Sequence, residues 1–156
     1  MDFQNEINTL YKMRFMENEG DDIVIFEQLL NEIAVNSNVD IIPSLCTLLE
    51  DEVAEPSVSE YVIDTIFYIA KQRNTDKALE HVATSIPNML MSAEFWVERI
   101  HQLILSNAEF TKAYAEILTN INPNITEVIK KNLVKLKEEP IDAIQIKQIE
   151  LLLKNS

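Results

Sequence analysis

The chain has 156 residues, of which 47% are hydrophobic and 25% are charged, and it carries a formal net charge of −13. A chain of this length and composition folds around one hydrophobic core, so we expect residues 1–156 to form a single domain and exclude a disordered chain. The negative charge repels nucleic acid and anionic membranes, and it favours a protein partner with a basic surface.

Apolar residues recur every three or four positions along almost the whole sequence, which predicts helices and no strands. The breaks between the apolar runs are short and contain residues that stop or cap helices, such as Gly20. We count eight or nine helices. They are predicted at about 3–17, from Asp21 or Asp22 to 35, 41–51, 56–72, 75–86, 93–105, from Ser106 or Asn107 to the break at Asn122, 125–138 and 141–154.

Particular residues set the expected helix ends. Asp40 is expected to cap the third helix, and Pro56 opens the fourth because proline fits the first turn of a helix. The fourth helix is apolar on most sides and is expected to be central, with Tyr61, Val62, Ile63, Ile66, Phe67, Ile69 and Ala70 as its apolar residues. Thr75 is expected to cap the fifth helix and Pro87 to end it one residue earlier. Ser92 is expected to cap the sixth helix, which begins with an acidic first turn.

The number of helices and the length of the loops predict the fold class. Helices joined by short loops pack as antiparallel neighbours, and eight or nine of them do not all touch one another in a simple bundle. We therefore expect an all-α fold, an irregular stack of antiparallel helix pairs similar to a HEAT or armadillo superhelix. No exact sequence period is visible, so any repeat is structural and degenerate.

Two scarce residue types limit the chemistry. Gly20 is the only glycine, and phosphate-binding loops and nucleophile elbows need several, so we expect no such cofactor site. Cys46 is the only cysteine, which excludes an internal disulfide or a cysteine zinc cluster. The N-terminus lacks the basic start and apolar run of a signal peptide, and no apolar stretch is long enough to span a membrane, so the expected location is the cytoplasm.

One pair of residues has the spacing of a metal site. Glu98 and His101 lie one helical turn apart, as in di-iron bundles, but those sites need a second such pair and two more glutamates. We interpret the pair as part of a solvated helix face and predict no metal. Cys46 lies among leucines and is expected to be an inert core thiol, and Trp96 and Tyr114 are expected in the core. We predict no enzymatic activity.

The acidic residues gather in the N-terminal part, where residues 1–60 hold fourteen acids against two bases. Two clusters stand out, one before the second predicted helix and one between the third and the fourth. Carboxylates at the end of a helix oppose its dipole, so the second cluster gains no local stability and its placement favours a binding role. The predicted partner-binding residues are Glu17, Glu19, Asp22, Glu50, Asp51, Glu52, Glu55 and Glu60.

Two segments resemble a known family. The sequences Leu45-Cys-Thr-Leu-Leu-Glu-Asp-Glu and Ala93-Glu-Phe-Trp-Val-Glu-Arg-Ile-His-Gln resemble the immunity protein 30 family of bacterial polymorphic toxin systems over roughly residues 10 to 120. Glu94 and Trp96 match that family's Glu-x-Trp-like start, whereas Leu103-Ile-Leu-Ser-Asn lacks the arginine of its Arg-Ile-Leu-Asn-like end. The resemblance implies a small acidic all-α antidote that binds and blocks a toxin domain, often a nuclease.

Three functions remain open from the sequence. The first is an immunity protein whose acidic residues cover a cognate toxin with a basic surface. The second is a helical-repeat adaptor that binds a peptide or a helix in an apolar groove, for which an exposed apolar patch is the signature. The third is an enzyme with an unrecognised carboxylate centre or one built on His101, which a cleft with perturbed titratable groups would indicate.

Overall fold

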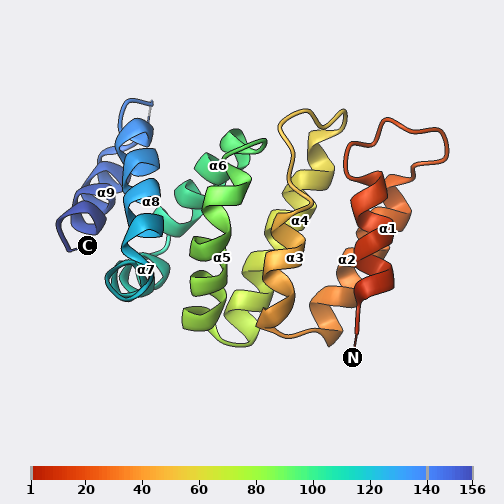
Figure 1. The fold of residues 1–156 in the computed structure, drawn as a ribbon, viewed down its shortest axis with the longest axis horizontal. Helices are drawn as coiled ribbons and strands as arrows, with labels where there is room; N and C mark the ends of the chain where they lie inside the picture. Colours follow the sequence, from red (N-terminus) through yellow and green to blue (C-terminus); the bar gives the residue numbers. More distant parts are fainter. Residues whose placement is uncertain (1, 140, 156) are drawn as a thin grey trace.

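The computed structural model describes residues 2–139 and 141–155. In this part of the chain nine α-helices and one short 3-10 helix follow one another in a row, with the two ends of the chain at opposite ends of the row (Figure 1). The helices are α1 (Gln4–Met13), α2 (Ile23–Asn36), the 3-10 helix η1 (Val39–Ile41), α3 (Ile42–Cys46), α4 (Pro56–Gln72), α5 (Thr75–Met89), α6 (Glu94–Leu105), α7 (Ala108–Asn120), α8 (Pro123–Leu136) and α9 (Ala143–Asn155).

Each helix packs mainly on its neighbours in the row. α1 lies against α2, α2 against α4, and α3 against α4 and α5. α5 is central, since it contacts α3, α4, α7 and α8, and α9 closes the far end against α7. This arrangement confirms the predicted all-α fold, an irregular stack of helix pairs.

One hydrophobic core runs through the whole stack, from Phe3 at one end to Leu152 at the other. α4 was expected to be central because it is apolar on most sides, and its residues Val62, Ile63 and Ile66 are fully buried. Tyr61, which was expected to point inward with them, is only partly buried. Burial of this kind stabilises the fold by about 25 cal/mol for each Å² of apolar surface removed from water.

Several predicted helix ends are correct because the signal for them is local. Asp22 caps α2, where its carboxylate accepts a hydrogen bond from the Val24 amide at 2.8 Å. Pro56 occupies the first turn of α4, as predicted, and Pro43 occupies the first turn of α3. A proline is tolerated there because amides of the first turn have no partner within the helix.

Other predicted ends are wrong. The third helix, expected at 41–51, is the 3-10 turn η1 followed by the five residues of α3, and the cap is Asn38 in place of Asp40. α5 is capped by Asn74 in place of Thr75. α5 also continues past Pro87 to Met89, because proline removes only one hydrogen bond and Met89 is buried in the core.

Candidate functional site

The two acidic clusters predicted from the sequence lie side by side at one edge of the stack (Figure 1). This edge is formed by the connections 14–22, 47–55 and 90–93, together with residues 137–139 and 141–142 between α8 and α9, and we call it the acidic edge. Backbone hydrogen bonds join its connections. The Ala54 amide donates to the Phe15 carbonyl at 2.9 Å, and the Asp51 amide donates to the Ser92 carbonyl at 2.9 Å. The edge therefore has a fixed backbone shape.

The predicted partner-binding residues divide into free and engaged side chains. Glu17, Glu19 and Glu52 are exposed, and the described part of the chain offers them no hydrogen bond or ion pair. Glu55 is also exposed and accepts only a 3.4 Å hydrogen bond from Ser57. Asp22 caps α2, and Glu60 pairs with Arg99 of α6 at 3.4 Å.

Glu50 and Asp51 have structural contacts that the sequence argument did not foresee. The Asp51 carboxylate accepts from the Phe95 amide at 3.2 Å, and it thereby supplies the cap of α6 that Ser92 was expected to supply. The Glu50 carboxylate pairs with Arg14 at 3.2 Å, and its carbonyl accepts from the Trp96 indole at 2.9 Å. These two acids are therefore stabilised by residues far away in the sequence, Arg14 at the end of α1 and the first residues of α6, which the local argument did not include.

The acidic edge also takes in carboxylates from the C-terminal half of the chain. Burial raises the pKa of Glu98, and the negative charges of Glu139, Glu94 and Asp51 raise it further, whereas Lys135, which pairs with Glu94, lowers it; all four charged groups thus lie within electrostatic range of Glu98. The connections 14–22, 47–55, 90–93 and 137–142 hold eleven acidic and two basic residues. The connections 37–41, 73–74 and 121–122, which lie on the opposite side of the stack (Figure 1), hold one of each.

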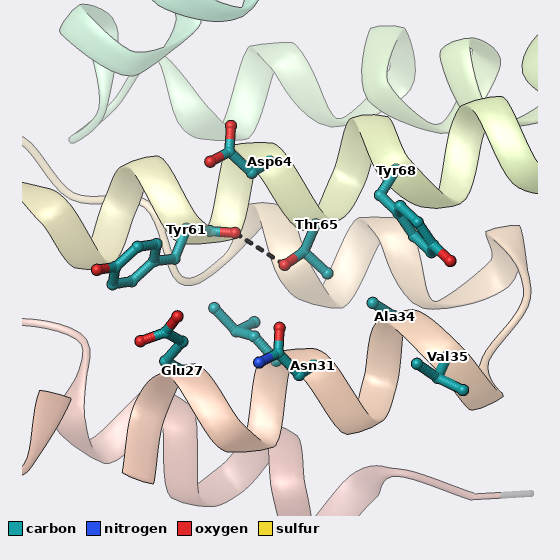
Figure 2. A pocket seen from close by; sticks show the side chains of 9 residues that line it. Glu27, Asn31, Ala34, Val35, Tyr61, Asp64, Thr65 and Tyr68 are labelled. Carbon is teal, nitrogen blue, oxygen red and sulfur yellow. Dashed lines mark hydrogen bonds between the residues drawn. The ribbon is translucent and has the colours of Figure 1, made fainter. Parts of the chain in front are cut away.

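A groove of about 520 Å³ lies between α2 and α4. Figure 2 shows Glu27 opposite Tyr61 at one end, Val35 opposite Tyr68 at the other, and Asn31 between them. Both helices begin at the acidic edge, so the end with Glu27 and Tyr61 is the end nearer to that edge. The groove is lined by Glu27, Leu30, Asn31, Ala34, Val35, Tyr61, Asp64, Thr65 and Tyr68.

The groove has an acidic and an apolar end. Its lining residues include two carboxylates and no lysine or arginine. Thr65 donates its hydroxyl hydrogen to the Tyr61 carbonyl at 2.8 Å, which occupies that donor within α4 (Figure 2). Val35 and Tyr68 are 63% and 45% exposed, so the second end is an apolar surface open to solvent.

Sequence reasoning missed this groove, although a signal was present. Tyr61, Asp64 and Tyr68 recur at helical spacing on α4, and Glu27 and Asn31 do so on α2, so each set lies on one face of its helix. Tyr61 was assigned to the core with the apolar residues around it. The groove forms because α2 and α4 pack against each other, and the sequence pattern does not show which helices are neighbours.

His101 is not on a solvated helix face, as the sequence interpretation had it. It is fully buried, where its Nδ1 contacts Asn132 at 2.8 Å and its Nε2 contacts the Tyr114 hydroxyl at 2.9 Å. Burial lowers the pKa of His101 to about 4, whereas the hydrogen bond with Asn132 raises it. His101 thus joins α6, α7 and α8 through a buried polar network.

The residues that were considered for chemistry have structural surroundings. Cys46 is buried, and its burial raises the pKa of the thiol to about 12, which keeps it protonated. Trp96 and Tyr114 lie in the core, as expected. In the described part of the chain no group of three or more potential metal ligands gathers, and no helix there has both the length and the apolar content to cross a membrane.

Comparison with known proteins agrees with the resemblance noted in the sequence. The family model described as immunity protein 30 matches residues 12–114, which includes α2 to α6, the groove and most of the acidic edge. Searches of curated proteins and of solved structures gave no match. Because the family model covers more than half of the 156 residues, the chain belongs to the immunity protein 30 family.

Proposed function

We propose that this chain is an antidote that binds a cognate toxin domain through the acidic edge and thereby blocks a nuclease-type active surface. The observation that carries this proposal is the gathering of eleven acidic residues on one edge, eight of them on the connections 14–22 and 47–55, which a backbone hydrogen bond joins. A nuclease must be basic where it holds phosphates. An acidic edge of fixed shape is complementary to such a surface and accelerates the encounter with it.

Repulsion between neighbouring carboxylates at this edge lowers the stability of the protein when no partner is bound. Glu98 has a raised pKa partly because Glu139, Glu94 and Asp51 lie near it, which means that these carboxylates repel one another. A basic partner would relieve that repulsion on binding. Five of the eleven acids, Glu17, Glu19, Glu52, Glu138 and Glu139, are exposed and make no side-chain hydrogen bond or ion pair among the described residues, which leaves them available to a partner.

The proposed mechanism is steric and electrostatic occlusion without catalysis. The bonds between the connections, such as Ala54 to Phe15, hold the edge in place before the partner arrives. A preorganised surface loses little conformational entropy on binding, so more of the contact energy appears as affinity. The partner is then a protein with a basic surface, and neither nucleic acid nor a membrane is required.

Growth rescue tests the proposal. Where the neighbouring gene encodes a large protein, its C-terminal domain would be induced with and without the chain, and the complex would be recovered at low and high salt. We expect rescue, and a complex that weakens as salt rises. Changing Glu17, Glu19 and Glu52 to lysine should abolish rescue without unfolding the protein, because these side chains make no contacts within the described residues.

A matched control uses three other exposed acids. Glu109, Glu116 and Glu127 lie on α7 and α8, outside the acidic edge, and their change to lysine alters the net charge by the same amount. This variant should still rescue growth. Equal loss of rescue in both variants would mean that only net charge matters, and unchanged rescue by the edge variant would refute the proposed surface.

A further inference from the structure

The groove between α2 and α4 is lined by exposed polar side chains that have no partner among the described residues. Within the described residues the carboxylates of Glu27 and Asp64 and the amide of Asn31 have no hydrogen bond or ion pair, although they line one hollow. By contrast, Glu50 and Glu60 at the acidic edge are paired with arginines. Two unpaired carboxylates with no cation in the lining make the groove complementary to a positive charge.

The tyrosines add to this preference. Tyr61 lies opposite Glu27 at one end of the groove (Figure 2), and a lysine or arginine placed there meets both a carboxylate and an aromatic face. A cation within about 6 Å of the centre of an aromatic ring is attracted by the negative face of the ring. The same combination occurs within this molecule, where the Arg14 guanidinium lies 3.7 Å from the centre of the Tyr11 ring and also pairs with Glu50.

The other end of the groove selects an apolar side chain. Val35 and Tyr68 are exposed there, and Ala34 beside them leaves room above the backbone of α2 (Figure 2). Tyr61 and Tyr68 are seven residues apart on α4, which corresponds to about 10 Å along the helix. The cationic and apolar ends are thus separated by two helical turns. Side chains two turns apart on one face of an approaching helix have the same separation.

We propose that the groove binds an amphipathic helix of the toxin, with a lysine or arginine against Glu27 and Tyr61 and an apolar residue two turns away against Val35 and Tyr68. This inference rests on the proposed function, since it names a second contact of the same partner. A second copy of this chain is a poor occupant, because each copy carries a net charge of −13. The groove begins at the acidic edge, so one partner reaches both surfaces.

Calorimetric titration with the purified, catalytically inactivated toxin domain tests the groove separately from the edge. We expect Glu27→Lys and Val35→Asp each to weaken binding about 10-fold to 100-fold, or roughly 1.4–2.7 kcal/mol. Both side chains are exposed and make no polar contact, so the variants should keep their helical circular dichroism and melting temperature. Glu32→Lys on α2 and Val134→Asp on α8, at exposed positions outside the groove, are the matched controls and should bind normally.

The outcomes separate the two proposals. If the native protein binds the toxin domain and the groove variants bind equally well, the groove inference is wrong and the proposed function stands. If the native protein does not bind, the proposed function fails, and a probe decides the groove alone. The probe is an alanine-based helical peptide of 18 residues with arginine at position 6 and leucine at position 13. Amide shifts on α2 and α4, lost in Glu27→Lys, would support the groove, and unchanged spectra would overturn it.

Discussion

The two edges of the stack are built in different ways. At the edge that carries 37–41 and 73–74, one arginine joins neighbouring elements, because Arg73 donates to the Val35 carbonyl at 2.8 Å and to the Ser37 carbonyl at 3.2 Å. At the acidic edge the backbone of adjacent connections is joined directly, and most of the carboxylates point to solvent. The charge on the opposite edge serves the fold, whereas Glu17, Glu19 and Glu52 on the acidic edge make no side-chain hydrogen bond or ion pair among the described residues.

The largest expected effect is on the rate of association with the toxin domain. At low salt, changing Glu17, Glu19 and Glu52 to lysine should slow association about 100-fold, because electrostatic steering depends on the local field of the edge. The control variant, in which Glu109, Glu116 and Glu127 are changed to lysine, should associate much faster than the edge variant. Stopped-flow measurements over a salt series check this, and the two variants should converge at high salt. If the association rates of both variants depend equally on salt concentration, the acidic edge does not steer the partner more than the rest of the surface does.

The second prediction separates the effect of protonating the buried His101 from the effect of protonating the carboxylates of the acidic edge. His101 has a folded pKa near 4, below its ordinary value of 6.5, so the folded state binds fewer protons than the unfolded state between these values. Its contribution to stability is present above pH 6.5 and is lost as the pH falls toward 4, by about 2 kcal/mol between pH 7 and pH 5.

Urea unfolding at both pH values measures this loss. His101→Gln does not titrate, so its stability should be lower at pH 7, because the network with Asn132 and Tyr114 is disturbed, but should change less between pH 7 and pH 5. The carboxylates of the acidic edge are present in both proteins, so the difference between them isolates His101. Parallel pH profiles would show that His101 is not responsible.

The third prediction distinguishes two neighbouring acids of the edge. Asp51→Ala removes the acceptor of the Phe95 amide at the start of α6 and should cost about 1 kcal/mol, as the loss of a helix cap does. Glu52→Ala removes no contact and should stay within about 0.5 kcal/mol of the native stability. Thermal unfolding checks both. Both variants lose one negative charge, so their association rates should be reduced alike.

The smallest expected effect is an increase in the free energy of unfolding. Glu98→Gln removes a carboxylate whose pKa is raised by burial and by neighbouring acids, so the variant should be more stable at pH 7. Glu98 is partly exposed, so screening by solvent limits the gain to about 0.3 kcal/mol, and the gain should shrink further with added salt. Glu127→Gln on α8 serves as the comparison and should change nothing. A loss of stability in Glu98→Gln would contradict the repulsion inferred for the edge.

The features that sequence reasoning predicted correctly are those with local causes. The apolar spacing predicted the helices, and Asp22 and Pro56 marked the starts of α2 and α4, because a cap or a first-turn proline acts within a few residues. The free acids Glu17, Glu19 and Glu52 were also found, since exposure follows from a charged run between helices. That the edge contacts a partner stays a prediction.

The failures have causes that lie far apart in the sequence. Asp51 caps a helix whose first residues are more than forty positions away, and no local pattern shows it. His101 was placed on a surface because its neighbour Glu98 is charged, yet Asn132 and Tyr114 satisfy both ring nitrogens and make its burial possible. The groove depends on α2 lying beside α4, which only tertiary packing decides.

The hydrogen bonds between the connections of the acidic edge bear on how such a protein diverges. Since Ala54 is joined to Phe15 and Asp51 to Ser92 through main-chain atoms, the course of the backbone does not depend on which side chains stand at 17, 19 or 52. Those positions are free to accumulate substitutions one at a time without loss of folding. Under the proposed function, a lineage with this scaffold can therefore change the partner that it binds by substituting these exposed side chains alone.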